Sequence, residues 1–369
     1  MSDLPPLVAL DDELLERHRR AHADLDVANS SAEPMVRTTL RHVARRLLLE
    51  GLANVQPVFD EIDRPLLLPP PRRFLGVVAQ QRLAGAAAAL RYIDSALTMA
   101  TMPGGRPVVQ PTAPCVLNAL LAGPVTERET NAGLIRVSPT NWMPDANRFE
   151  HPPADVVGEL LDEAIAVAAD TRSAAVERAG WLAFVTMTIH PFVDGNGRTA
   201  RALFLATIGA DLPGDIDWGV LDQWHLARAE YIRALQQGQQ AERYRGEDVD
   251  AGPFVRMGAI ASTRGAEVGK ARLELLSNAV TSVPELADPV VLRALVDRFV
   301  LIDELLDDPL VDRVAAMDHI DALVRTGLIE WTHAGPGVPV EELGVRGVKI
   351  GDRLQPVVRQ LRHARYAGA

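Results

Sequence analysis

The stretch Asp194-Gly-Asn-Gly197 is the strongest constraint on how this chain can fold. Residues 173–188 before it and residues 199–209 after it both show the apolar periodicity of a helix. Two glycines and an asparagine favour left-handed or open backbone conformations, so one helix cannot run comfortably through them. The sequence therefore predicts two helices joined by a tight loop with exposed backbone N–H groups.

This loop has the chemistry of a phosphate site. Arg198 and Arg201 begin the second helix, so two guanidinium groups converge with the loop N–H groups and a helix N-terminus. Asp194 can offer a carboxylate to Mg²⁺, which binds one or two protein oxygens besides phosphate and water. His190 ends the first helix, and its imidazole can accept a proton from an attacking hydroxyl near neutral pH. A base, a metal ligand and an anion hole are thus predicted within one loop.

Each of these side chains also has an ordinary structural interpretation. Taken singly, His190 could cap a helix, Asp194 could form a turn, and Arg201 could be solvated or ion-paired. Taken together, residues 190–201 match the pattern His-x-Phe-x-Asp-Gly-Asn-Gly-Arg-x-x-Arg at every fixed position. A match of this length rarely arises by chance. The stretch closely resembles the signature of the Fic (filamentation induced by cAMP) family.

The resemblance implies that the chain is a protein adenylyltransferase, or AMPylator. Fic proteins bind ATP with Mg²⁺ on this helix-loop-helix and transfer AMP to a Ser, Thr or Tyr hydroxyl of a target protein, which could be the enzyme itself. Transfer at phosphorus depends on alignment and charge neutralisation, which suits these residue types. The implied site comprises the general base His190, the Mg²⁺ ligand Asp194, the anion-hole residues Gly195, Asn196 and Gly197, and the phosphate-binding Arg198 and Arg201. Phe192 would be a core anchor.

Two further features resemble parts of Fic proteins that lie outside the motif. Residues 133–144 alternate apolar and polar side chains and then break into turn residues, which predicts a short hairpin. In the family a flap at this place holds the target backbone by strand addition; a plain structural hairpin is the alternative. Tyr231 resembles an aromatic position that borders the adenine, although a core tyrosine fits equally well. The candidate flap residues are Ile135, Arg136, Val137 and Trp142.

A glutamate in the N-terminal region is a candidate inhibitor. Many Fic proteins carry the pattern Ser/Thr-x-x-x-Glu-Gly/Asn on a helix, and its glutamate pairs with the second arginine of the motif. The only Glu followed by Gly or Asn is Glu50. Arg46 stands where the pattern has Ser or Thr, so an ordinary i,i+4 surface pair of Arg46 and Glu50 is the alternative. We expect Glu50 to pair with Arg201 and inhibit the enzyme.

We expect a mainly α fold, with a Fic helical core, a β-hairpin flap, a helical N-terminal region and a small C-terminal winged helix-turn-helix (α+β). This arrangement resembles the Fic subclass with an N-terminal inhibitory helix and a C-terminal winged-helix-like domain. The predicted domains are a helical region (1–125) with the inhibitory helix (36–52), the catalytic core (126–252), a helical linker (253–280) and the winged-helix-like domain (281–369). Further helices are expected at 14–25, 74–97, 154–169, 221–239, 254–276, 289–299, 301–306 and 310–326, with strands at 328–332 and 348–350.

Composition bears on partners and location. The net charge of -11 disfavours general attraction to nucleic acid or anionic membranes. Acidic residues outnumber arginines in 301–327, so we expect this segment to contact protein or support a dimer, with DNA binding the less favoured alternative. No residue points specifically to self-association. No apolar run is long enough to span a membrane, and the first residues lack a secretory pattern, so we expect a cytoplasmic protein.

Two other functions remain compatible with the sequence. The same loop could use another nucleotide, remove AMP or transfer a phosphoryl group, because the walls of the base pocket lie outside the motif. Alternatively, the chain could be a regulator without catalysis, in which the loop senses nucleotide and the winged segment binds a promoter. That hypothesis requires an idle His190 and a basic DNA-binding surface, and the sequence shows no such surface.

Overall fold

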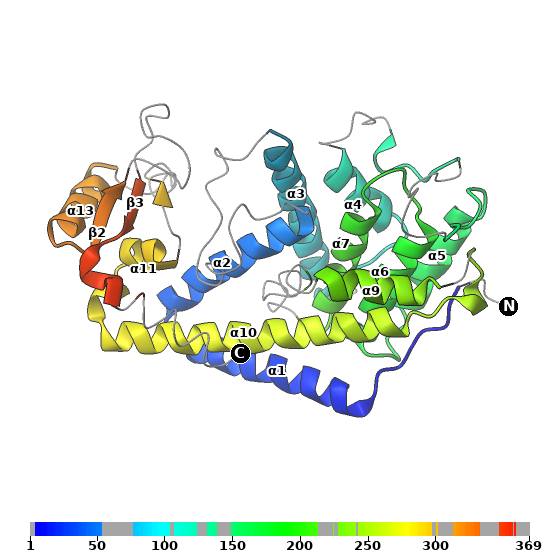
Figure 1. Cartoon of the computed structure of the whole chain (residues 1–369), viewed down its shortest axis with the longest axis horizontal. Coiled ribbons are helices and arrows are strands. Elements are labelled where there is room, and N and C mark those ends of the chain that lie inside the picture. Colours follow the sequence, from blue (N-terminus) through cyan, green and yellow to red (C-terminus); the bar gives the residue numbers. More distant parts are fainter. Residues whose placement is uncertain are drawn as a thin grey trace. The chain divides into compact units, whose positions relative to one another are not determined.

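The computed structural model describes residues 4–53, 77–103, 107–123, 131–138, 149–212, 224, 228–240, 243–296, 300–301, 313–332, 347–356 and 358. These residues are mainly helical and include one small antiparallel sheet, so the predicted fold class is confirmed (Figure 1). The chain forms two compact units. The first takes its described residues from Met1–Asp26, Leu47–Val55 and Val77–Gly269, and the second from Val27–Arg46, Gln56–Gly76 and Lys270–Ala369. The four predicted domain ranges stay predictions.

The helices agree closely with the expected ranges. They are α1 (Asp12–Ser31), α2 (Pro34–Ala53), α3 (Val77–Ala100), α4 (Ala113–Ala122), α5 (Val157–Ala168), α6 (Ala175–Ile189), α7 (Asn196–Gly209), α9 (Arg228–Gly238), α10 (Gly252–Ser282), α11 (Pro289–Val296) and α13 (Arg313–Arg325). Helix α4 was not singled out from the sequence. No helix among the described residues is long and apolar enough to cross a membrane.

Helix α6 is the centre of the first unit. All of its residues are buried, which explains why it is apolar on every side. Helix α7 packs along it, α5 packs against α6, and α3 and α4 pack against α7 (Figure 1). A Cβ atom on Gly180 would lie 2.9 Å from the Cα of Val255, so glycine lets the backbone of α10 approach α6 directly. The loop that joins α6 to α7 is therefore held at the end of two rigid, packed helices.

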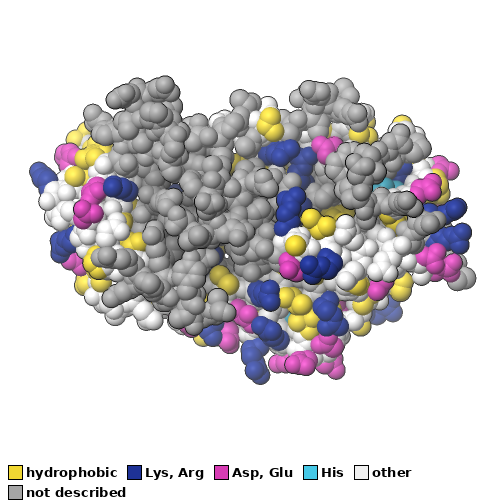
Figure 2. All heavy atoms as spheres, viewed as in Figure 1, with side chains coloured by type: hydrophobic (Ala, Val, Ile, Leu, Met, Phe, Trp, Pro, Cys, Tyr) yellow, Lys and Arg dark blue, Asp and Glu magenta, His cyan; other side chains and the backbone are white. Residues whose placement is uncertain are grey.

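The segment before α1 is attached to the start of α6. The carboxylate of buried Glu177 accepts hydrogen bonds from the N–H groups of Leu10 (2.7 Å) and Ala174 (2.9 Å). The Trp181 indole N–H donates to the carbonyl of Pro5 (3.1 Å). These bonds satisfy groups that would otherwise be buried without partners. Figure 2 shows acidic and basic side chains intermixed over α1, as expected for its solvent-facing side.

The second unit contains the sheet. Its strands are β1 (Val300–Leu301), β2 (Ile329–Thr332) and β3 (Gly347–Ile350), in the order β1-β3-β2, with both pairs antiparallel. Helix α11 packs against β3, and α13 packs against β2. The helix expected at 301–306 is wrong at its first residue, because Leu301 pairs with Gly347 as a strand; residues 302–306 lie outside the described part. The winged-helix assignment stays a prediction.

Candidate active site

The loop between α6 and α7 has the conformation that its sequence predicts. His190 follows the last residue of α6 in the left-handed region (φ 51°, ψ 63°), and its N–H donates to the carbonyl of Thr186 (3.2 Å). Gly195 precedes α7 with φ 82°, also left-handed. Among the described residues, His190 is the only non-glycine with positive φ. Such a conformation costs about 1–2 kcal/mol and often marks a functional position.

Asn196 closes the loop. Its side-chain carbonyl accepts a hydrogen bond from the N–H of Phe192 (2.9 Å), and its amide donates to the carbonyl of Phe192 (2.8 Å). Both residues are buried, and Phe192 is the predicted core anchor. The side chain of Asn196 therefore shapes the loop. Its backbone N–H is one of the first in α7, which have no partner within the helix and point toward an incoming anion.

Asn118 on α4 supports the same loop and was missed from the sequence. Its buried amide donates to the carbonyl of Asp194 (2.9 Å) and to the hydroxyl of Thr199 (3.2 Å). Its side-chain carbonyl accepts from the N–H of Gly133 (2.8 Å), where the predicted flap begins. A single polar residue within the apolar run of α4 was the signal that could have identified it.

Asp194 and Arg198 form an ion pair at the start of α7. The nitrogen–oxygen distance is 3.0 Å; the side chain of Asp194 is 55% exposed, whereas that of Arg198 is 9% exposed. Arg198 also donates to the carbonyl of Leu121, and burial lowers the pKa of its guanidinium. Asp194 presents its carboxylate to solvent, while Arg198 is largely occupied by protein acceptors. Of the two, Asp194 is freer to bind a ligand.

Arg201 lies over the loop. Its Nη1 is 3.5 Å from the position that a Cβ on Gly197 would take, an ordinary van der Waals distance. Its Nε is buried and has no hydrogen-bond partner among the described residues. An unpaired guanidinium N–H beside a helix N-terminus is well suited to donate a hydrogen bond to a phosphate oxygen.

A third arginine, Arg82 on α3, belongs to this cluster and was also missed. Its Nε is buried without a partner in the described part of the chain. Helix α3 packs against α7, and the charges of Arg82 and Arg201 both lower the pKa of Arg198. Arginines from two helices thus repel one another electrostatically. Such a concentration of positive charge is typical of a site that binds a polyanion.

Tyr231 is part of an aromatic cluster next to Arg201. Its ring centroid lies 5.2 Å from that of Phe254 and 5.5 Å from that of Trp224, and its hydroxyl donates to the sulfur of Met187 (3.0 Å). Burial raises the pKa of Tyr231, against the opposing charge and hydrogen bond of Arg201. This packing is that of a core tyrosine, and the adenine-bordering role stays a prediction.

His190 is neutral at physiological pH. Burial, together with the neighbouring His151 and Arg136, lowers its pKa to about 4, against the opposing effects of the Met187 backbone and the charge of Asp194. The ring centroids of His190 and His151 are 4.5 Å apart. His151 was not identified from the sequence. A neutral imidazole at this position can accept a proton.

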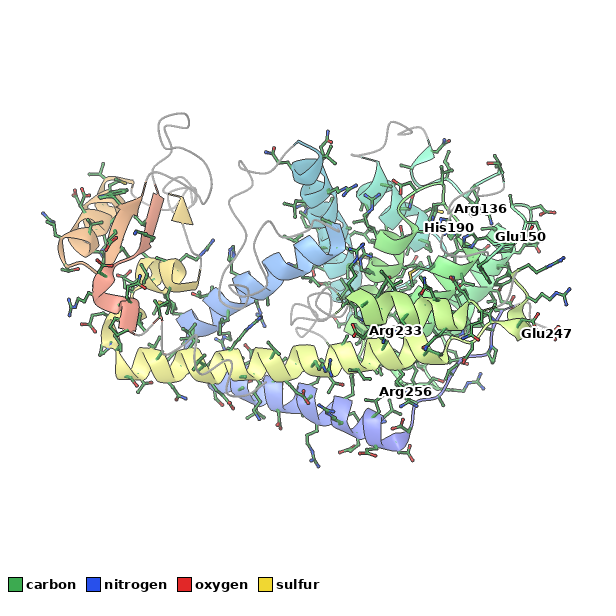
Figure 3. All side chains as sticks on the ribbon, in the orientation of Figure 1. Arg136, Glu150, His190, Arg233, Glu247 and Arg256 are labelled. Atoms are coloured by element: carbon green, nitrogen blue, oxygen red, sulfur yellow. The ribbon has the colours of Figure 1, made fainter. Side chains whose placement is uncertain are left out.

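Arg136 fixes the backbone of His190. Its guanidinium donates to the carbonyls of His190 (2.8 Å), Ile189 (3.3 Å), Ser138 (3.2 Å) and Pro152, and only 3% of the residue is exposed. Figure 3 shows Arg136 beside His190. The side chain is thus directed into the protein, toward the loop.

The described part of the predicted hairpin pairs with the loop. Ile135 forms an isolated antiparallel bridge with Phe192, and the N–H of Arg136 donates to the carbonyl of Pro191 (2.9 Å). Val137 is 94% exposed. Residues 139–144, with Trp142, lie outside the described residues. The flap role stays a prediction.

The candidate inhibitor Glu50 lies in α2, as expected. Its side chain and that of Arg46 lie outside the described part of the structure.

In the described part of the structure, no group of three or more His, Cys, Asp or Glu side chains could hold a metal ion. One exposed carboxylate fits Mg²⁺ when phosphate oxygens and water complete the shell, and Asp194 is that carboxylate.

One loop of this helical bundle carries a neutral histidine, an exposed carboxylate and the N-terminus of a helix, and comparisons with known proteins identify the domain. Residues 117–207 match the model of the Fic/DOC family, and the chain therefore contains a Fic domain. The subclass stays a prediction. No curated protein sequence matches the chain.

Solved structures are similar in fold. A Fic family protein from Desulfovibrio desulfuricans G20 superposes with a TM-score of 0.53 at 17% identity, covering 94% of this chain and 98% of that one. A Fic domain containing signaling protein from Bacteroides thetaiotaomicron VPI-5482 gives a TM-score of 0.51 at 13% identity, covering 70% of this chain and 98% of that one. At such identities the similarity establishes the fold alone.

Proposed function

We propose that this chain is a protein adenylyltransferase that moves AMP from Mg-ATP to a Ser, Thr or Tyr hydroxyl of a protein. Fic domains are associated with nucleotide transfer in general, and the finer assignment rests on one observation. A neutral His190 lies at one end of the loop, and an anion-binding helix N-terminus with the unpaired Nε of Arg201 lies at the other. This arrangement brings a proton acceptor and a polyphosphate site together.

The residues have distinct roles in the proposed reaction. The N–H groups at the start of α7 and the guanidinium of Arg201 hold the β- and γ-phosphates of ATP. His190 takes the proton of the attacking hydroxyl as a bond forms between its oxygen and the α-phosphorus. The bond from the α-phosphorus to its bridging oxygen breaks, and pyrophosphate leaves. Asp194 would hold Mg²⁺, which neutralises phosphate charge when bound.

The half-buried position of His190 suits this role. Its left-handed backbone places the ring beyond the last turn of α6, and Arg136 holds its carbonyl there. Exposed Leu134 and Val137, on either side of the Ile135 bridge, offer a target segment an apolar surface near the base. We therefore expect the hydroxyl to arrive along residues 134–137.

The test is transfer of label from ATP that carries it on the α-phosphate. Wild type, Glu50→Gly and His190→Ala are incubated with Mg²⁺ and this ATP, and label on protein is followed by gel and mass spectrometry. We expect label that disappears with His190→Ala and persists in a matched control, His319→Ala, which changes an exposed histidine of the second unit. Label from γ-labelled ATP alone would instead indicate phosphoryl transfer, and label from another nucleotide alone would change the substrate.

We further propose that Glu50 inhibits the resting enzyme through Arg201. The buried Nε of Arg201, which has no partner among the described residues, and the place of Glu50 in α2 motivate this. A carboxylate on that guanidinium would occupy the position of the γ-phosphate. Glu50→Gly should therefore raise transfer well above wild type, and an unchanged rate would favour the alternative surface pair with Arg46.

The C-terminal unit is proposed to contact protein rather than DNA. On the described part of α13, Asp318 and Asp321 are exposed, and like charges repel phosphate. Salt-dependent retardation of duplex DNA in a gel would contradict this proposal.

A further inference from the structure

We propose that His151 is a positioning residue for His190: it packs beside the imidazole of His190 and holds that ring in the orientation from which it accepts a proton. The inference rests on the proposed function, in which His190 is the general base.

The two rings form a pair at the end of α6. Their centroids are 4.5 Å apart and their planes are inclined by 30°. His151 comes from the segment that precedes α5, so it reaches His190 across the fold rather than along the helix. The ring of Phe149 packs edge-on against His151 at 5.5 Å. These contacts restrict rotation of the His151 ring, so the ring that packs against His190 has a fixed orientation.

The hydrogen bonds define which ring nitrogens carry protons. Nδ1 of His151 lies 2.8 Å from the carbonyl oxygen of Thr188. A carbonyl can only accept, so this nitrogen carries hydrogen in the neutral ring. The backbone of Met187 acts on the His190 ring in the direction that raises its pKa, as a carbonyl facing one ring nitrogen does. Its other nitrogen then keeps the lone pair that a general base needs.

The His151 ring is anchored on the end of α6, the helix that His190 follows. Carbonyls in the last turn of a helix lack intrahelical partners, and that of Thr188 is used by His151. Arg136 joins the same two segments, because it donates to the carbonyls of His190 and of Pro152, the residue after His151. The backbones of both histidines are therefore tied together, and His151 is well placed to act on the orientation of His190.

A purely structural role for His151, as a partner for the helix end, is the competing explanation. Two variants separate the explanations. His151→Asn keeps an amide donor near the position of Nδ1 and removes the ring, whereas His151→Phe keeps a ring and removes the donor. If the ring contact positions His190, the asparagine variant should be the more damaging. If only the bond to Thr188 matters, the phenylalanine variant should be.

The experiment combines a spectroscopic and a kinetic measurement on the full chain. Proton–nitrogen NMR correlations of the imidazoles report the tautomer of His190 in wild type, His151→Phe and His151→Asn, and they need no turnover. We expect one dominant His190 tautomer in wild type and His151→Phe, and averaged nitrogen shifts in His151→Asn. We also expect kcat to fall by about 10- to 100-fold in His151→Asn, with an unchanged KM for ATP.

The outcomes distinguish this inference from the proposed function. Identical His190 nitrogen shifts in all three proteins would overturn the positioning role, as would a loss confined to His151→Phe. A dependence of the His190 tautomer on His151 in a protein that transfers no AMP would support positioning and reject the proposed function. Thermal unfolding of each variant verifies that the measured protein is folded.

Discussion

The ring centroids of His151 and His190 lie 4.5 Å apart at the α6–α7 loop, and those of His18 and His22 lie 4.6 Å apart in the core of the same unit. Burial lowers the pKa of His190 to about 4 and that of His18 to about 3. Two pairs with similar spacing, each containing one histidine with a strongly lowered pKa, thus occur in one protein. A depressed histidine pKa therefore does not by itself identify a base.

The surroundings separate the two pairs. The Nε2 atoms of His18 and His22 lie 3.1 and 3.0 Å from the hydroxyl of Ser262, and all three residues are buried. This core pair joins α1 to α10 and leaves no access for a ligand. His190 instead has a left-handed backbone and lies beside the exposed carboxylate of Asp194. Access, backbone conformation and neighbouring charge are therefore the features on which the proposed role of the loop pair rests, and the core pair lacks them.

Replacing one histidine of each pair should have opposite effects. His190→Gln should lower AMP transfer by about 10²- to 10⁴-fold, because the proton acceptor is lost, and should leave the free energy of unfolding nearly unchanged. His18→Gln should lower that free energy and leave kcat of the folded protein unchanged. Labelling kinetics and denaturant unfolding of both variants measure this. Loss of activity in a fully folded His18→Gln protein would contradict a purely structural role for His18.

The pH dependence of the free energy of unfolding should also distinguish the two histidine pairs. The folded pKa of His18, about 3, lies below the ordinary value near 6.5, so between these values the unfolded chain binds the extra proton. Stability is complete above about pH 6.5 and falls by roughly 1.4 kcal/mol per pH unit as the pH drops through this window. Urea unfolding at several pH values measures the slope, and His18→Gln should reduce it. An unchanged slope would exclude His18 as its source.

Activity should be less sensitive to the same change in pH. His190, with a pKa of about 4, stays mostly neutral at about pH 5, so kcat should differ less than about twofold between about pH 7 and about pH 5. A base with an ordinary pKa would lose about 25-fold over this range. Rates are measured at saturating Mg-ATP, where the protein is shown to remain folded. A decline of the larger size would show that His190 titrates as an ordinary exposed histidine.

The sequence predicted the loop much better than its supports. His190, Asp194 and Gly195 are close in the chain, and the preferences of glycine and of helix ends fix their local conformation. Asn118 reaches the carbonyl of Asp194 across 76 positions, and Arg136 reaches that of His190 across 54. Such contacts depend on how the helices pack, which no local pattern encodes. The hairpin prediction shows the same limit, because Ile135 pairs with Phe192 on the loop.

The two glycines of the loop test how much of its function depends on backbone conformation. Gly195 has φ 82°, and a Cβ there would lie 3.0 Å from Ala122 and Asn118. Gly195→Ala should therefore cost roughly 1–2 kcal/mol of stability. Gly197→Ala is the matched control, since Gly197 is helical and its Cβ would meet only Arg201, at an ordinary 3.5 Å. Chemical unfolding compares them, and equal losses would argue against strain at Gly195.

The smallest effect should come from Arg82, whose charge acts on Arg198 at the loop. Its Nε has no partner among the described residues, and its charge acts on Arg198 together with that of Arg201. A polyphosphate would relieve this repulsion, so Arg82→Gln should weaken binding of ATP and of inorganic pyrophosphate by about 3- to 10-fold. AMP binding should hardly change, because the repulsion concerns the phosphates beyond the first.

Calorimetric titrations with ATP, pyrophosphate and AMP measure these changes in affinity. Arg91→Gln, on the exposed side of α3, is the matched control. Equal weakening of AMP and ATP would place Arg82 at the α-phosphate, and no weakening of either would remove it from the site.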